Sequence, residues 1–242
     1  MKRIRTRIFS IVMACAMLIS LLPVPALAAG GSIPESGGTL SNGTYTLSEN
    51  VTVTNSLIVE TGSSVTIDLN GHTLDMGEKQ VTVNGTLTIQ DTDGNGTLKG
   101  TTSDLITVNK NASLNVSGGT IETIGNTAVK LAYKSGIFTM TAGTISAAGT
   151  TVNAMMGTVS VTGGKILTSS SATWTFAIDN NYGEASITIG AENGNNEAVY
   201  VTSVRGHKDA KLTFNSGIIG RVGGVINADD VISGLLETDV SS

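Results

Sequence analysis

One short segment has the residue types and spacing of a calcium-binding turn. Asp91, Asp93 and Asn95 place side-chain oxygens at the first, third and fifth positions, and a glycine follows each of the last two. Calcium loops of this pattern also need a bidentate glutamate at the twelfth position, which here is Thr102. Because Asp, Asn and Gly also favour plain turns, we predict a turn, with Ca²⁺ held by Asp91, Asp93 and Asn95 as the alternative.

The chain offers few residues for acid–base chemistry on sugars. Glycoside hydrolysis needs two carboxyl groups about 5–10 Å apart. His72 and His207 each stand alone at a predicted turn, where a structural role is the commoner one. The outward positions expected to align from one repeat to the next carry mainly amides and hydroxyls: Asp68, Gln90, Asn115, Thr141, Thr162, Gly190 and Asn215. We therefore expect no catalytic residues.

Paired hydroxyls suggest a third chemistry. Thr139 and Thr141 match Ser160 and Thr162 in the next repeat, so hydroxyls would stand in register on adjacent strands. This makes ice binding a minor alternative. The pairing covers only two repeats, and exposed strands are rich in Thr in any case.

A repeat of the chain would position all of these groups. Each copy reads apolar, any residue, apolar, then a small turn and another apolar residue. The first apolar positions are Val65, Leu87, Leu114, Phe138, Val159, Ile187 and Leu212, spaced 21 to 28 residues apart. A second alternating strand precedes most copies, at Val81/Val83, Ile106/Val108, Val129/Leu131, Trp174/Phe176/Ile178 and Val199/Val201. This alternation predicts that Trp174 is a core residue and not a platform for sugar stacking.

The repeat predicts an all-β protein, a right-handed parallel β-helix of about seven coils. Alternation with period two is typical of strands that bury one face, and no helical pattern lies between the copies. Stacked coils would align like positions into apolar ladders inside and Thr or Asn ladders outside. We expect an N-terminal cap or first strands over 29–63, the β-helix over 64–222, and a C-terminal segment or linker over 223–242.

The first 28 residues predict a secretory signal peptide. A basic start precedes an apolar run over 8–22, and Ala26-Leu27-Ala28 supplies a small-residue cleavage pattern, so we predict cleavage after Ala28. The run is shorter than the roughly 20 residues of a membrane span, so no span should remain after cleavage. The full chain has net charge −5, and loss of four basic residues leaves 10 basic and 19 acidic residues, a net charge of −9. Such a charge disfavours nucleic acid as a partner.

Three stretches carry a resemblance to a known group of proteins. They are Ser64-Val65-Thr66-Ile67-Asp68-Leu69-Asn70-Gly71-His72-Thr73-Leu74, Gly85-Thr86-Leu87-Thr88-Ile89-Gln90-Asp91 and the Ser-Gly-Gly-Thr-Ile corner at 117–121. They resemble stretches of secreted or cell-surface β-helix proteins of gut Gram-positive bacteria, within the pectin-lyase-like superfamily. The resemblance covers about residues 40–242, and it implies an extracellular structural or adhesive protein.

Residues and resemblance together give an expected function. We expect a secreted or cell-surface structural or adhesion module without catalysis, whose candidate partners are host or cell-surface glycans or other surface proteins. The competing class is a polysaccharide lyase or glycoside hydrolase. Related lyases use a carboxylate-bound Ca²⁺ with an Arg or Lys base. Arg205 and Arg221 are the two arginines of this sequence after residue 28. Related hydrolases need several Asp with His and a basic pair, of which Asp229, Asp230 and 206–208 are fragments.

Overall fold

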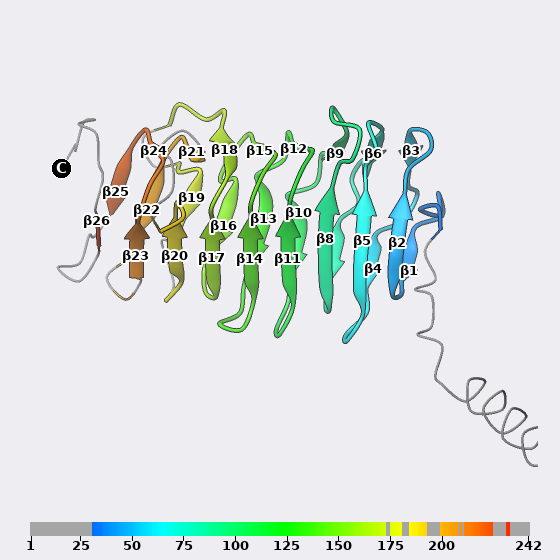
Figure 1. Cartoon of the computed structure of the whole chain (residues 1–242), viewed down its shortest axis with the longest axis horizontal. Helices are drawn as coiled ribbons and strands as arrows, with labels where there is room; N and C mark the ends of the chain where they lie inside the picture. The colour runs from blue at the N-terminus through cyan, green and yellow to red at the C-terminus, as the bar shows by residue number, and fades with distance from the viewer. Residues whose placement is uncertain are drawn as a thin grey trace, which may run out of the picture.

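The chain folds as a stack of parallel strands. The computed structural model describes residues 31–172, 175–180, 184–192, 199–207, 209, 211–224 and 231–232. Every regular element among them is a strand, and the strands form three parallel sheets that run along one axis (Figure 1). The predicted all-β parallel β-helix is therefore confirmed. None of the described residues form a helix of the length and apolarity that crossing a membrane requires.

Each coil contributes one strand to each sheet. Sheet A contains β2 (Gly43–Thr46), β5 (Ser64–Asp68), β8 (Thr86–Gln90), β11 (Ser113–Val116), β14 (Ile137–Met140), β17 (Thr158–Val161), β20 (Ser186–Ile189), β23 (Lys211–Phe214) and β26 (Val231–Ile232). Sheet B contains β1 (Gly38–Leu40), β4 (Leu57–Val59), β7 (Val81–Val83), β10 (Asp104–Val108), β13 (Thr127–Leu131), β16 (Val152–Ala154), β19 (Ile178–Asp179), β22 (Val204–Gly206) and β25 (Val222–Gly224). Sheet C contains β3 (Val51–Thr52), β6 (Thr73–Asp75), β9 (Thr97–Gly100), β12 (Thr120–Thr123), β15 (Thr144–Ala147), β18 (Gly164–Thr168), β21 (Val199–Val201) and β24 (Ile218–Ile219).

The apolar repeat forms the interior. The seven first positions of the repeat pair with one another from β5 to β23, and all are buried: Val65, Leu87, Leu114, Phe138, Val159, Ile187 and Leu212. Side chains two residues further along each strand form a second buried column beside them. Because the side chains of a strand alternate between its faces, the intervening residues point outward.

Small residues turn the corners between sheets A and C. Asn70 and Gly71 follow β5 with φ of 48° and 77°, in the left-handed region that Asn and Gly tolerate best. In later coils the same corner stacks glycine on glycine, and a Cβ on Gly143 (φ 91°) would stand 2.6 Å from the carbonyl oxygen of Gly119. Close contact of neighbouring coils therefore requires glycine at that corner.

Two strand assignments made from the sequence differ in the structure. Val199–Val201 was predicted to precede the next repeat as a second strand, but it is β21 of sheet C, paired with β18. After Ile189 the chain enters sheet C at β21 and then sheet B at β22. The strand that directly precedes the next repeat is therefore β22, and Val199–Val201 is the sheet C strand before it. Phe176 is buried but lies outside the interior cluster, since β19 begins only at Ile178. Trp174 lies outside the described residues.

The stack extends beyond the span predicted for the helix. β1 to β4 fall within the segment expected to be a cap or first strands, and they pair in parallel with β4 to β7. β25 and β26 continue sheets B and A past residue 222. The sheets therefore include residues on both sides of the predicted 64–222 helix.

Candidate functional site

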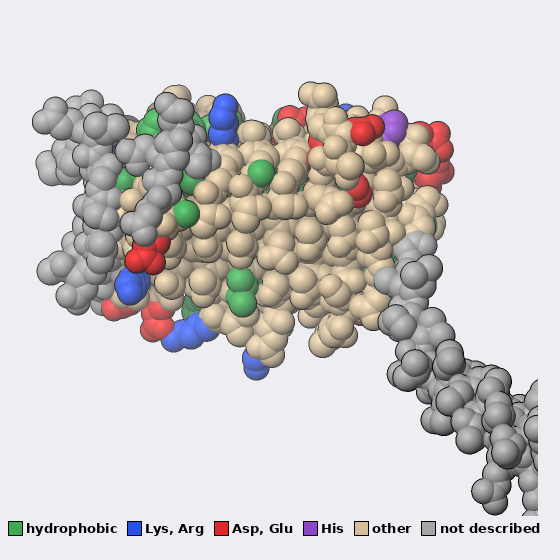
Figure 2. All heavy atoms as spheres, viewed as in Figure 1, with side chains coloured by type: hydrophobic (Ala, Val, Ile, Leu, Met, Phe, Trp, Pro, Cys, Tyr) green, Lys and Arg blue, Asp and Glu red, His purple; other side chains and the backbone are tan. Residues whose placement is uncertain are grey.

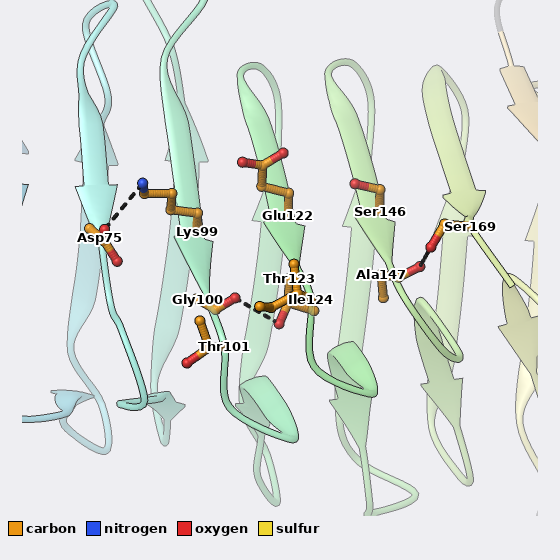
Figure 3. Close-up of a pocket in the computed structure, with 10 residues that line it drawn as sticks. All are labelled: Asp75, Lys99, Gly100, Thr101, Glu122, Thr123, Ile124, Ser146, Ala147 and Ser169. Atoms are coloured by element: carbon orange, nitrogen blue, oxygen red, sulfur yellow. Dashed lines mark hydrogen bonds and ion pairs between the residues drawn. The ribbon is translucent and has the colours of Figure 1, made fainter.

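An open groove lies on the outer side of sheet C. It has a volume of about 410 Å³ and is lined by Asp75, Lys99, Gly100, Thr101, Glu122, Thr123, Ile124, Ser146, Ala147 and Ser169 (Figure 3). These residues come from the C-terminal parts of β6, β9, β12 and β15 and from the segments that follow β9, β12 and β18. Volumes of this size are typical of small-ligand sites, which run from about 300 to 1,000 Å³.

A column of charged side chains stands along the groove. The pairing of β9 with β6 and β12 places Lys99 between Asp75 and Glu122 on one face of the sheet. Lys99 Nζ lies 3.2 Å from Asp75 Oδ2, and the dashed line in Figure 3 marks this ion pair. Glu122 is exposed and takes part in no ion pair among the described residues. Ser146 follows Glu122 in the same column.

Ile124 projects from the turn after β12 with 78% of its surface exposed. The turn is fixed by Thr123, whose hydroxyl donates to the carbonyl of Gly100 and accepts the N–H of Gly125. A Cβ on Gly125 would stand 1.8 Å from the carbonyl oxygen of Thr102, so glycine is required there. The turn therefore fixes the backbone at Ile124 and leaves its aliphatic side chain exposed.

The predicted calcium residues lie at the corner between β8 and β9. The carboxylate of Asp91 accepts the N–H of Gly71 at 2.8 Å and the N–H of Gly96 at 2.7 Å. Asp93 and Asn95 are exposed, and Asn95 has a φ of 69°. The described residues contain no group of three or more His, Cys, Asp or Glu side chains that could hold a metal. Asp91 thus braces two corners through backbone amides, and Ca²⁺ binding by Asp91, Asp93 and Asn95 stays a prediction.

Asp68 is a buried carboxylate at the centre of a partly buried hydrogen-bond network at the preceding corner. Its carboxylate accepts the backbone N–H groups of Asn70 and Thr92, the hydroxyl of Thr92 and the side-chain amide of Gln90. Burial favours the neutral acid and would raise the pKa of Asp68, but these donors outweigh it and hold the pKa below its ordinary value. Asp68 therefore stays ionised and joins two coils.

The register corrects one predicted outward column. Asn115 was expected to align with Gln90, but it pairs with Thr88 and Thr139. The position beside Gln90 is Ser117, whose N–H bonds to the carbonyl of Ile89. Both outward positions of a strand lie on one face, so alternation alone does not say which column a residue joins.

The corrected register gives a long outer column on sheet A in which every member but Asn115 is Thr or Ser, here called the hydroxyl column. Its members pair in sequence from β2 to β23: Thr44, Thr66, Thr88, Asn115, Thr139, Ser160, Thr188 and Thr213. Figure 2 shows this face, where the middle of the sheet carries few charged or hydrophobic side chains. Of the two hydroxyl columns predicted for adjacent repeats, the one through Thr139 and Ser160 extends over most of the sheet, whereas the one through Thr141 and Thr162 gives way to Asp68 and Gln90 in the first coils.

The two arginines considered for catalysis are held in the last coils. Arg205 donates to both oxygens of Asp179, from Nε at 2.7 Å and Nη2 at 2.5 Å. Both guanidinium groups contact the ring of Phe176, with centroid distances of 5.0 Å for Arg205 and 4.3 Å for Arg221. Arg221 also donates to the carbonyl of Thr175. Both arginines are therefore engaged in cation–π contacts and hydrogen bonds of the last coils.

The remaining candidates are dispersed. His207 Nδ1 lies 3.6 Å from the Asp209 carboxylate, close to the C-terminal coils, while His72 sits at the corner after β5. Lys208, Asp229 and Asp230 lie outside the described residues. The sequence pointed to none of the groove residues, because Asp75, Lys99 and Glu122 become neighbours only through the register of three strands.

Comparison with known proteins gives no match. No family model, no curated protein and no solved structure matches this chain.

Proposed function

We propose that this chain is a secreted or cell-surface β-helical module with a structural or adhesive role and no catalysis. The observation that carries the proposal is that charged side chains of neighbouring coils pair with one another. Lys99 pairs with Asp75, Lys130 with Asp104 at 2.8 Å, and Arg205 with Asp179. Such pairs tie each coil to the next instead of converging on a reacting group. The predicted signal peptide and the resemblance to pectin-lyase-like surface proteins support the same reading.

A binding screen run beside an activity assay tests this proposal. The purified chain is applied to an array of plant, microbial and host glycans, and is incubated with pectin, alginate and glycosaminoglycan. We expect glycan binding, with neither new reducing ends nor unsaturated products. Release of either product, at a rate proportional to protein concentration, would replace the adhesive role with an enzymatic one.

The groove supplies the one observation that favours a glycoside hydrolase. Asp75 and Glu122 stand on the same face two strands apart, which is about 10 Å along the sheet. Acid pairs of inverting hydrolases lie at about 6.5–9.5 Å. Lys99 stands between them and forms an ion pair with Asp75. Any hydrolysis found in the assay should then be lost in both Asp75→Asn and Glu122→Gln.

The hydroxyl column favours the minor alternative, ice binding. Its members repeat at the strand spacing of about 4.8 Å, so the face presents one regular row of hydroxyl groups that Asn115 interrupts. Measurement of freezing and melting points in the presence of the chain tests this reading. A gap between the two temperatures that Thr88→Tyr closes would support it, and coincident temperatures would leave the adhesive role in place.

A further inference from the structure

The groove on sheet C is elongated along the helix axis. Asp75, Lys99, Glu122 and Ser146 come from four consecutive strands, and Ser169 follows the fifth. Four steps of about 4.8 Å give a length of about 19 Å. Since strands cross this direction at right angles, a ligand lying in the groove would run parallel to the axis. The shape fits a short stretch of a linear polymer.

Both hydrogen-bond acceptors and hydrogen-bond donors in the groove are available to a ligand. The side chains of Glu122 and Ser146 make no hydrogen bond or ion pair within the described part of the chain, so both can accept a hydrogen bond from a ligand hydroxyl. Lys99 makes one contact with Asp75, which leaves donors on its ammonium group. Figure 3 shows these side chains on the same face of adjacent strands, with the Lys99 ammonium group turned toward Asp75.

An apolar surface lies next to these polar groups. Ile124 and Ala147 line the groove, and the Thr123 hydrogen bonds hold the turn that carries Ile124. The groove thus combines an aliphatic contact with hydroxyl-binding groups.

The net charge of the groove restricts the charge of the ligand that it can bind. Asp75, Lys99 and Glu122 together carry one net negative charge, and the negative charge of Glu122 has no cation paired with it among the described residues. An anionic polymer would meet repulsion there. We propose that the groove binds one strand of an uncharged linear polysaccharide, with Glu122, Ser146 and Lys99 bonding to its hydroxyls and Ile124 contacting its C–H surfaces. The inference rests on the proposed adhesive function and names the ligand of that function.

Three oligosaccharides of equal length and different charge test the inference. Titration calorimetry with the purified chain uses cellohexaose as the neutral probe, the hexamer of galacturonate as the anionic probe and the protonated hexamer of glucosamine as the cationic probe. We expect binding of the neutral probe that changes little with salt, and none of the anionic probe. Binding of the cationic probe alone, lost in Glu122→Gln, would overturn the inference in favour of a simple cation site.

Variants of the lining residues locate the binding. Ile124→Ser should weaken binding of cellohexaose about tenfold, because it removes the aliphatic contact. Glu122→Gln should weaken it about fivefold, because a neutral acceptor forms a weaker bond than a carboxylate. Thr139→Ala on sheet A is the control and should bind as the parent chain does, and the circular dichroism and melting of each variant report its folding.

The outcomes separate this inference from the proposed function. If cellohexaose binds equally to all variants, the groove is not the site, although the adhesive function stands. If other glycans bind to the array but none of the three hexamers binds, the inference alone is overturned. If neither the hexamers nor any glycan of the array binds, the adhesive function is overturned with it.

Discussion

At the scale of single residues, carboxylates of this chain act as braces between coils. Asp68 accepts four hydrogen bonds, two of them from Thr92 in the next coil and one from Gln90. Asp91 joins the corner at Gly71 to its own turn. A carboxylate that accepts several N–H and O–H groups is strongly held, because hydrogen bonds to a charged acceptor are about twice as strong as neutral ones.

The lowered pKa of Asp68 predicts a dependence of stability on pH. A depressed folded-state pKa stabilises the fold above the unfolded value of about 3.9, and this contribution is lost as the pH falls through the folded value. Asp68→Asn should remove this part of the acid sensitivity and lower the free energy of unfolding at neutral pH by about 1–3 kcal/mol. Urea denaturation at neutral and acidic pH measures both. Asp93→Asn, in an exposed turn, is the control, and an equal loss in that variant would contradict the role given to Asp68.

The hydrogen bonds at the Asp91 corner predict that Asp91 contributes more than Asp93 to the free energy of unfolding. Asp91→Ala should destabilise the fold by about 1–3 kcal/mol, since it leaves the amides of Gly71 and Gly96 without their acceptor. Asp93→Ala should change stability by less than about 0.5 kcal/mol, as an exposed substitution. Thermal melts with and without Ca²⁺ complete the test. A melting temperature that rises with Ca²⁺ concentration in the parent chain and not in Asp93→Ala would establish the calcium site instead.

At the scale of elements, the phase of each strand, meaning which of its residues face inward, decides how far a substitution lowers the free energy of unfolding. Leu114 of β11 is fully buried in the interior column, whereas Thr139 of β14 lies in the outer hydroxyl column. Leu114→Asp should prevent folding, because it places an unpaired charge among stacked apolar side chains. Thr139→Ala should change the free energy of unfolding by about 0.5 kcal/mol or less. Circular dichroism and thermal melting compare the two variants, and similar melting temperatures would reject the assigned phase.

The sequence predicted the strands and the interior columns because both follow from alternation with period two. Val65, Leu87 and Leu114 could be aligned without coordinates, since each begins the same apolar pattern. The outer columns were harder to predict. Asn115 and Ser117 both face outward, so only the pairing with β8 and β14 shows which column each one joins. The sequence did not show to which sheet Val199–Val201 belongs, because the length of the turn after Ile189 does not determine which sheet the chain enters next.

The groove was missed because the sequence was searched for apolar positions and for outward positions of another strand. Asp75, Lys99 and Glu122 are spaced 24 and 23 residues apart, and each directly follows a buried residue that the register aligns. The exposure of Ile124 depends on a turn held by Thr123 and Gly125, which no local propensity distinguishes from other turns. The register of the strands therefore decides which surface residues become neighbours, while the alternation of apolar residues decides which residues form the interior.

At the scale of the whole molecule, the fold is one-dimensional, since each coil contacts mainly the coils before and after it (Figure 1). Stability in such a stack is approximately a sum of coil and interface contributions. Central strands such as β8 and β11 have partners on both sides, whereas β3 lies at one end of sheet C. The end coil therefore has fewer interactions to hold it closed.

This arrangement predicts a gradient of local stability along the axis. Amide hydrogen exchange should be slowest for Leu87 and Leu114 in the central coils and fastest for Val51 and Thr52 of β3, because local opening spans free energies from about zero up to that of global unfolding. Leu114→Ala should speed exchange throughout the central coils, as a cavity there costs about 2–5 kcal/mol. Thr139→Ala serves as the matched exposed control. Mass spectrometry of exchanged peptides measures the gradient, and equal protection of β3 and β11 would mean that the stack opens as one cooperative unit, against the nearest-neighbour picture.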